Sequence, residues 1–245
     1  MKRNIMLTMR YDGSCFHGWQ IQENSNTVQQ EICSALKRIL GEEITVNGCS
    51  RTDTGVHANM FCCNFRTDTD RENDKIIKGL NAVLPSSIGV YDIKDMPYDF
   101  HARYDCKGKE YIYKIWNSKH KNPFLTEYAL HYPYELDVEL LDRQAKDFVG
   151  THDFSAFCAA GSSVQTTVRT ITACSVTRDG ELVTFSVTGD GFLYNMVRIM
   201  VGTLLDINSG KIPEGSIGEI ISCCDRNKAG ITAKARGLYL NRVYY

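Results

Sequence analysis

The stretch TVQQEICSALKRILG, residues 27–41, predicts a helix with both of its ends marked. Thr27 and Gln30 have the spacing of a capping box, in which the first residue's hydroxyl accepts a backbone N–H of the first helical turn. The apolar side chains recur at the spacing of one helix face, and Gly41 is the residue type that typically follows a helix end. The elements on either side of this helix decide the fold class.

Alternation of apolar and polar residues predicts strands before and after the helix. The first half of the chain has predicted strands at 4–11, 43–49, 60–65 and 88–93, and a second predicted helix at 71–83 that stops before Pro85. This order is βαββαβ, which is the ferredoxin-like or split-βαβ unit.

The second half of the chain repeats this order more loosely. It has predicted strands at 110–117, 170–177, 182–188 and 237–243, predicted helices at 137–149, 192–207 and 214–223, and a type I′ turn signal in RDG at 178–180. The predicted fold class is therefore α+β, with two ferredoxin-like halves, antiparallel sheets, flanking helices and an active-site cleft between the halves. We expect two domains, residues 1–103 and 104–245.

The composition is that of an ordinary globular protein, with 43% hydrophobic and 23% charged residues among 245. The 28 basic and 29 acidic residues nearly cancel, which argues against a non-specific nucleic-acid binder. The N-terminal apolar run is too short for a signal peptide, and residues 192–207 are interrupted by Arg198 and Asp206, so no membrane span is expected. We therefore expect a cytoplasmic protein without a membrane partner.

The ten cysteines do not form a metal-binding pattern. No two of them are three positions apart, so the spacing typical of zinc ligands is missing, and the six histidines form no ligand motif either. Reduced and mostly buried thiols are the expected state, which agrees with a cytoplasmic location. The sequence thus predicts no metal.

The stretch CSRTDTGVHAN, residues 49–59, joins two predicted strands of the first half. It is longer than a hairpin needs, and such loops are more often functional than decorative. A purely structural alternative is an Asx turn, in which Asp53 accepts local backbone N–H groups, Gly55 supplies a positive φ and Arg51 pairs with a surface acid. The pattern alone leaves both interpretations open.

Within this loop, RTDTGVHA resembles the signature of the tRNA pseudouridine synthase A (TruA) family, whose usual form is RTDAGVHA. Seven further blocks resemble the family's other motifs in the same order: YDGSCFHGWQIQ (11–22), TVQQEICSAL (27–36), NAVLP (81–85), FHARYDCKGKEYIYKI (100–115), GTHDFSAF (150–157), GFLYNMVRIMVGTLLDI (191–207) and TAKARGLYL (232–240). The resemblance covers essentially the whole chain. It departs from the family pattern at Thr54, which replaces an alanine, at Ser87, which replaces an aspartate, and at Lys234, which replaces a proline.

The resemblance implies a pseudouridine synthase fold and an isomerase that converts uridine to pseudouridine at positions 38, 39 and 40 of the tRNA anticodon stem-loop. It also implies a homodimer that needs no metal or organic cofactor, and we expect the dimer interface in the second half. The alternative is a non-catalytic RNA-binding protein built on ferredoxin-like units. A cysteine- or metal-dependent hydrolase has little support, because the cysteines are scattered.

The resemblance carries two residue roles onto this sequence. The catalytic aspartate of the family's RTD motif is here Asp53, and its base-packing tyrosine in the KxYxY block is Tyr111. Without the resemblance, the position of Tyr111 is typical of a strand tyrosine that packs in the core or on the sheet surface. Arg51 is close enough in sequence to keep Asp53 ionised, since a cation within about 4–6 Å lowers a carboxylate pKa.

Arg198 lies among apolar residues of a predicted buried helix, where an unpaired guanidinium would cost several kcal/mol. By itself this pattern is typical of a helix arginine whose apolar stem is buried while its charged end reaches solvent. With the resemblance, pairing with Asp53 across the cleft is the preferred hypothesis. The remaining candidates for substrate binding are Thr52, Gly55, Val56, His57, Lys109 and Leu238.

Two routes remain open for the chemistry implied by the resemblance. Asp53 could attack C1′ of the ribose as a glycosidase nucleophile does, or it could remove a proton from C2′ so that a glycal forms. Both routes require an ionised aspartate and the exclusion of water, and the sequence does not choose between them.

Overall fold

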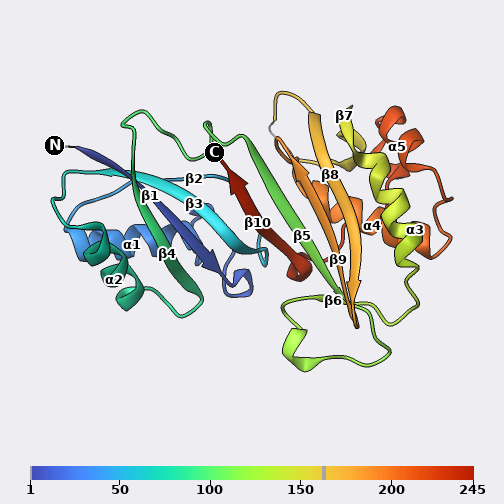
Figure 1. Ribbon diagram of the computed structural model, residues 1–245, viewed down its shortest axis with the longest axis horizontal. Coiled ribbons are helices and arrows are strands. Elements are labelled where there is room, and N and C mark those ends of the chain that lie inside the picture. The colour runs from blue at the N-terminus through green and yellow to red at the C-terminus, as the bar shows by residue number, and fades with distance from the viewer. Residues whose placement is uncertain (1, 162–163) are drawn as a thin grey trace. The chain divides into compact units, whose positions relative to one another are not determined.

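The structure is a computed structural model that describes residues 2–161 and 164–245. It divides into two compact units, which we describe one at a time (Figure 1). Unit 1 runs to Lys107 and also contains Tyr239–Tyr245, whereas unit 2 spans Gly108–Leu238. The expected boundary after residue 103 lies four positions earlier than this division, and the last seven residues, expected in the second half, belong to unit 1.

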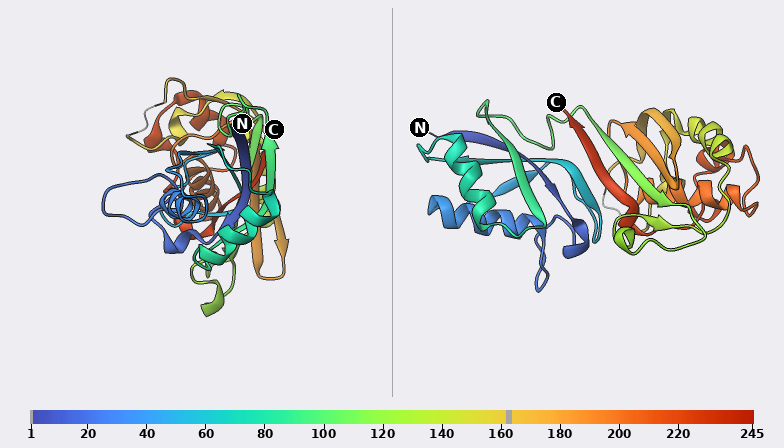
Figure 2. Two further views of the ribbon diagram at one scale, coloured as in Figure 1. Left: turned by 90° about the vertical axis from the view of Figure 1, so that its left-hand side faces the viewer. Right: turned by 60° about the horizontal axis from the view of Figure 1, so that its bottom comes forward.

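Unit 1 has the predicted βαββαβ order. Its elements are β1 (Arg3–Tyr11), α1 (Val28–Leu40), β2 (Val46–Gly48), β3 (His57–Thr67), α2 (Asn73–Val83) and β4 (Ile88–Met96). The antiparallel strand order is β4-β1-β3, and β2 pairs with the far end of β3. This is the ferredoxin-like arrangement, in which α1 and α2 pack against each other (Figure 2).

Helix α1 begins and ends where its sequence predicts. The Thr27 hydroxyl accepts the backbone N–H of Gln30 at 3.4 Å, and Gly41 follows the helix with a φ of 77°. That left-handed conformation costs a glycine little because it has no Cβ. The buried face contains Ile32 and Leu36, which are fully inaccessible to solvent, so the helix is held by its apolar stripe as well as by its caps.

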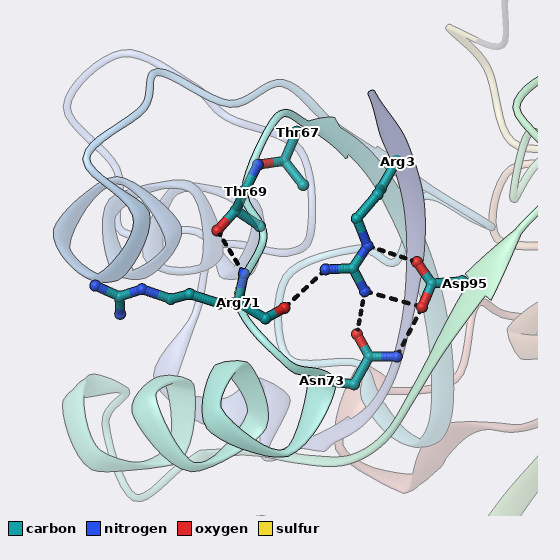
Figure 3. A network of polar contacts seen from close by, with 6 residues as sticks. All are labelled: Arg3, Thr67, Thr69, Arg71, Asn73 and Asp95. Atoms are coloured by element: carbon teal, nitrogen blue, oxygen red, sulfur yellow. Dashed lines mark hydrogen bonds and ion pairs between the residues drawn. The ribbon is translucent and has the colours of Figure 1, made fainter. Parts of the chain in front are cut away.

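A polar network joins β1, β4 and the start of α2 (Figure 3). Arg3 donates to both carboxylate oxygens of Asp95, at 2.8 and 2.9 Å, to the Asn73 side chain at 2.7 Å and to the carbonyl of Arg71 at 2.7 Å. Asn73 also donates to Asp95 at 2.9 Å. The Arg3 guanidinium lowers the pKa of the Asp95 carboxyl, and the same contact raises the pKa of Arg3.

The closing strand β10 (Leu238–Tyr244) pairs with β3, and Tyr239–Tyr245 are grouped with unit 1. It pairs in parallel with β3, opposite His57 and Ala58, on the edge that β1 does not occupy. The physical reason is that β2 pairs only with residues 63–65 of β3 and leaves the His57 end of that edge uncovered. The chain end is also tied to unit 1 by the Tyr245 hydroxyl, which donates to the Ala102 carbonyl at 2.8 Å.

Unit 2 contains further strands and three helices. Its elements are β5 (Gly108–Trp116), β6 (Leu130–His131), α3 (Val138–Ala145), β7 (Gly150–Asp153), β8 (Val168–Asp179), β9 (Leu182–Gly189), α4 (Met196–Asn208) and α5 (Ile217–Cys223). The strands β5-β9-β8-β7 are antiparallel, and β6 pairs in parallel with β5. The predicted α+β class is confirmed, although the sheets also contain two parallel pairs.

Two local predictions in unit 2 are wrong. Helix α4 begins at Met196 rather than at 192, because Asn195 before it has a left-handed φ of 59°. The β8–β9 hairpin turns at Gly180 and Glu181, and among the described residues in this turn only Gly180 has a positive φ, of 57°. This is the type II′ pattern, with glycine at the first central position, rather than type I′.

The cysteines differ from the expected burial. Their thiols are free, but only four are buried, and Cys15, Cys223 and Cys224 are exposed. Burial raises the pKa of Cys62, in the middle of β3, to about 11, so this thiol is protonated at neutral pH. Among the described residues, no helix combines the length and apolar character that crossing a membrane would require.

Candidate functional site

The loop between β2 and β3 is built around a tight turn. The backbone N–H of Val56 donates to the Asp53 carbonyl at 3.1 Å, and Gly55 has the predicted positive φ, of 77°. A positive φ at the third residue of a four-residue turn is the type II pattern, which favours glycine. The turn holds Asp53 at its first position, where the side chain is half-buried, and Thr54 at its exposed tip.

Thr52 anchors the loop to the protein beneath it. Its hydroxyl is 2.8 Å from the Tyr11 hydroxyl, and its carbonyl accepts the Trp19 backbone N–H at 3.0 Å. A Cβ at Gly18 would lie 2.5 Å from the same carbonyl, so only glycine permits this approach. Thr52 is buried, and its contacts therefore fix the backbone immediately before Asp53.

His57 anchors the other end of the loop. It is 1% exposed and its ring stacks on Tyr239 of β10 with centroids 4.6 Å apart. Its Nδ1 accepts the Gly13 backbone N–H at 3.0 Å, so the ring proton is on Nε2 in the neutral form. The Asp12 carboxylate lies 3.3 Å from the same Nδ1, but an accepting nitrogen cannot also donate to it. This geometry favours a supporting role for His57.

Gly13 approaches the loop still more closely. A Cβ there would lie 2.0 Å from the Val56 carbonyl oxygen, a distance that no side chain tolerates. Val56 is itself 2% exposed, so its side chain belongs to the core and its backbone forms the contact. Arg51, at the opposite end of the loop, is exposed. The loop thus combines a rigid base with two charged side chains, Arg51 and Asp53, that solvent reaches.

In unit 2, Tyr111 lies near the start of β5. It shares a buried face with Tyr113 and Ile115, as the alternation predicted. Its ring meets Phe192 edge-on, with centroids 5.0 Å apart and an interplanar angle of 76°. Phe192 therefore restrains the orientation of the Tyr111 ring. Lys109, two residues earlier, is half-buried.

Arg198 lies in the first turn of α4 and is half-buried. Its Nε donates to the Ala233 carbonyl at 2.7 Å, and its Nη1 donates to the Asn195 side chain at 2.6 Å. The Ala233 N–H returns a bond to the Arg198 carbonyl at 3.1 Å. These two hydrogen bonds inside unit 2 hold the guanidinium in a defined direction.

The segment that precedes β10 is fastened to β5. The Tyr113 hydroxyl donates to the Lys234 carbonyl at 2.7 Å, and burial raises the pKa of this tyrosine. A Cβ at Gly237 would lie 2.7 Å from the Tyr113 ring, so the segment lies directly against it. Leu238 follows and is buried. Its position is thus set by contacts within unit 2.

The structure groups the candidates by unit. Unit 1 brings together the loop residues from Arg51 to His57, and unit 2 contains Lys109, Tyr111, Arg198 and Leu238. Sequence reasoning missed the residues that hold the loop, which are Tyr11, Gly13, Gly18, Trp19 and Tyr239. The first four lie in the block YDGSCFHGWQIQ, whose two glycines in a polar context were the available signal. Within the described ranges, no cluster of three or more His, Cys, Asp or Glu side chains is arranged to hold a metal ion.

Comparison with known proteins matches this chain to one family. The family model described as tRNA pseudouridine synthase matches residues 7–105 and 144–245. The chain is 47% identical over 243 residues to tRNA pseudouridine synthase A of Acetivibrio thermocellus, with 99% of this chain and all of the relative covered. It is 46% identical over 244 residues to the protein of that name from Ruminiclostridium cellulolyticum, again with 99% of this chain and all of the relative covered.

A solved structure of a Cbf5-Nop10-Gar1 complex is a more distant match, with 14% identity, a TM-score of 0.37, and coverage of 87% of this chain and 44% of that chain. The family model covers more than half of the chain, including the RTD loop, and the relatives are matched over their full length. The chain belongs to the tRNA pseudouridine synthase A (TruA) family.

Proposed function

We propose that this chain, an isomerase of the tRNA pseudouridine synthase family, converts uridine to pseudouridine at positions 38, 39 and 40 of the tRNA anticodon stem-loop. Membership of the family supports the reaction and the tRNA substrate. The observation that carries the catalytic assignment is the RTD loop, in which Thr52 and His57 are buried anchors and Asp53 between them remains accessible.

The reaction breaks the bond between N1 of uracil and C1′ of ribose, turns the base and joins C5 to C1′. The proton leaves C5 and N1 gains one, so the product is an isomer and no atom has to be supplied by a cofactor. We propose that the Asp53 carboxylate starts this exchange, either by attack on C1′ or by removal of the C2′ proton. Both routes need the carboxylate in a fixed place, and the contacts of Thr52 with Tyr11 and Trp19 supply that restraint.

The two arginines are proposed to act on Asp53 electrostatically. Arg51 belongs to the same loop, and Arg198 is held by Ala233 and Asn195 so that its planar donor group has one orientation. A guanidinium beside a carboxylate favours its ionised form, which both chemical routes require.

Tyr111 is proposed to stack on the target uracil. A uridine must leave its helical stack to react, which costs a few kcal/mol. Stacking on an aromatic ring recovers about 1–3 kcal/mol of that cost. The edge-on contact with Phe192 supports this role because it restrains the ring before the base arrives. Lys109 and Leu238 are proposed to contact the substrate beside it.

We further propose a cytoplasmic homodimer with its interface in the second half of the chain. The net charge of −1 supports the dimer argument, because a single chain has no net positive charge to attract a polyanionic substrate. In a dimer, basic side chains of both copies could contact the same tRNA. Sedimentation equilibrium at micromolar concentration measures this directly, and a mass of one chain would contradict the proposal.

The decisive experiment measures tritium release from tRNA labelled at uridine C5, because substitution at C5 must expel that hydrogen. The wild type should release label, and Asp53→Asn should reduce release to background while binding tRNA normally. Thr54→Ala is the matched control, since it changes the exposed neighbour and should retain the wild-type rate. A wild-type chain that binds tRNA without releasing label would support the non-catalytic RNA-binding alternative.

The position assignment needs its own test. Anticodon stem-loops with a single uridine at 38, 39 or 40 and cytidine at the other two positions should each be modified. A substrate with cytidine at all three positions should not be modified, and modification of it would contradict the assignment.

A further inference from the structure

Unit 2 contains a pocket of about 280 Å³ that none of the proposed catalytic residues lines. It lies among the end of β5, the segment after it that leads to β6, and the segment before β10, all near the label β6 in Figure 1. Its lining consists of Trp116, Lys121, Asn122, Leu125, Thr126, Ala129, Leu130, His131, Lys234 and Arg236. This volume is close to the lower end of the usual range of about 300–1,000 Å³ for ligand pockets. A pocket of this size suits a small ligand such as a nucleotide.

The chemistry of the lining is divided into two kinds. Three residues are cations (Lys121, Lys234 and Arg236), and no aspartate or glutamate is among the ten. The rest of the wall includes the flat indole of Trp116 and apolar side chains. Cations alone would suit a bare phosphate, whereas cations beside an aromatic and apolar wall suit an anionic group attached to a planar ring.

Hydrogen bonds hold several of the lining side chains in place. Arg236 Nη1 donates to the Thr126 carbonyl at 2.8 Å and lies 3.9 Å from the Glu127 carboxylate. The Trp116 indole N–H donates to the His120 carbonyl at 3.1 Å. His131 is hydrogen-bonded to the Ser118 carbonyl at 2.9 Å. Because these side chains are already ordered, binding would cost less conformational entropy than ordering a mobile loop.

An exposed aromatic residue belongs to the same segment. Phe124 lies in the short 3₁₀ turn Pro123–Leu125, between the lining residues Asn122 and Leu125, and is 87% exposed. Its ring is therefore open to solvent and available for contact with a partner. Stacking with an RNA base would use such a ring, and Lys121 just before it adds positive charge.

We propose that this pocket binds an unstacked nucleotide of the tRNA other than the target uridine, with its phosphate on Lys121, Lys234 and Arg236 and its base against Trp116 or Phe124. The inference rests on the proposed function, because it takes tRNA as the substrate. Trp116 lies five residues from Tyr111 along β5, or about 17 Å in an extended strand, which is too far for one nucleotide to reach both.

The test is a double variant, Lys121→Ala with Lys234→Ala, made in full-length protein. Both side chains are exposed, and the Lys234 carbonyl that Tyr113 binds is retained, so the fold should be unaffected. Lys119→Ala is the matched control, because it removes an exposed lysine of the same segment that does not line the pocket. Phe124→Ala is paired with Tyr134→Ala, which removes an aromatic ring that is 71% exposed and also lies outside the lining.

We expect the double variant to raise the Kd for tRNA on the order of tenfold and to reduce the salt dependence of binding by about one phosphate contact, with the rate at saturating tRNA unchanged. Phe124→Ala should raise the Kd as well, and both controls should bind as the wild type does. Equal losses in the pocket variants and their controls would overturn the proposal, because the effect would then be general charge or general surface area.

Free ligands distinguish the source of the nucleotide. Uridine monophosphate at millimolar concentration should compete with tRNA for the wild type and lose this effect in the double variant. Competition by inorganic phosphate alone, together with a tRNA Kd that the double variant leaves unchanged, would make the pocket a site for a free anion and overturn the proposal. All binding is measured on an Asp53→Asn background, so these results do not depend on whether the chain proves to be a synthase.

Discussion

The hydrogen bond between the Tyr11 and Thr52 hydroxyls should stabilise the RTD loop by a measurable amount. The two hydroxyls are 2.8 Å apart, and both residues are buried, at 4% and 6% exposure. Thr52→Val keeps the side-chain shape and leaves the Tyr11 hydroxyl without this partner. A hydrogen bond of this kind contributes about 0.5–1.5 kcal/mol, so we expect a loss of that size in the free energy of unfolding. Tyr11→Phe removes the same hydrogen bond by deleting its other hydroxyl, and it should lower the free energy of unfolding by a similar amount.

The double variant separates this bond from other effects of the two substitutions. Replacing both partners by apolar groups of the same shape is often nearly neutral, so Tyr11→Phe with Thr52→Val should cost less than the two single costs together. Urea denaturation of the four proteins gives the coupling energy, and we expect about 1 kcal/mol or more. Strictly additive costs would refute the reasoning, because they would show that the hydroxyls do not interact.

The same variants test whether the bond positions Asp53. A misplacement of about 1 Å in a catalytic group can lower a rate by about 100-fold. Thr52→Val should therefore lower the single-turnover rate of tritium release well below that of wild type, while the Kd for tRNA changes little. A variant that loses stability but keeps the wild-type rate would contradict a positioning role for Thr52.

Three further predictions address the other residues. Tyr111→Ala should lower turnover strongly and Tyr111→Phe only mildly, since stacking needs the ring and not the hydroxyl; equal losses in single-turnover assays would show that the hydroxyl matters more. Arg198→Ala should lower the rate of tritium release by far more than it lowers tRNA affinity, and equal losses in both measurements would reject its proposed pairing with the catalytic carboxylate. The Asp95 carboxyl has a lowered pKa in the folded state, so its contact with Arg3 stabilises the protein above the unfolded value of about 3.9 and is lost as the pH falls below it. Because that pair is partly exposed, the contribution is at most about 1 kcal/mol, and the difference in unfolding free energy between wild type and Asp95→Asn should shrink from pH 7 to pH 3; a constant difference would contradict the ion pair.

Much of the fold could be predicted because its signals are local. The cap of α1 by Thr27, its end at Gly41 and the cap of α3 by Asp137 each depend on residues within one or two turns of the chain. The apolar periodicity between such ends predicts helix or strand directly. The positive φ at Gly55 was predicted for the same reason, since a type II turn involves only four neighbouring residues.

The errors lie where local signals compete or where a distant segment intervenes. The turn after β8 contains both Asp179–Gly180 and Gly180–Glu181, and the register of the two strands, not the dipeptide, placed glycine at the first central position. The start of α4 was predicted too early because residues 192–194 are Phe, Leu and Tyr, which continue the apolar pattern, whereas the left-handed Asn195 precedes the helix. Burial of the exposed cysteines was overestimated because residue type alone indicates average burial.

The sequence by itself determined the α+β class, the βαββαβ order of the first unit and the resemblance that identifies the family. Only the tertiary structure decided that β10 completes the edge of β3 beside His57, that Tyr11 and Gly18 hold Thr52, and that Trp116, Lys121 and Arg236 surround one pocket. The physical reason is the range of the interactions. Caps and turns are closed by hydrogen bonds between near neighbours, whereas these contacts join residues tens to nearly two hundred positions apart, and they form only when the packed sheets bring those residues together.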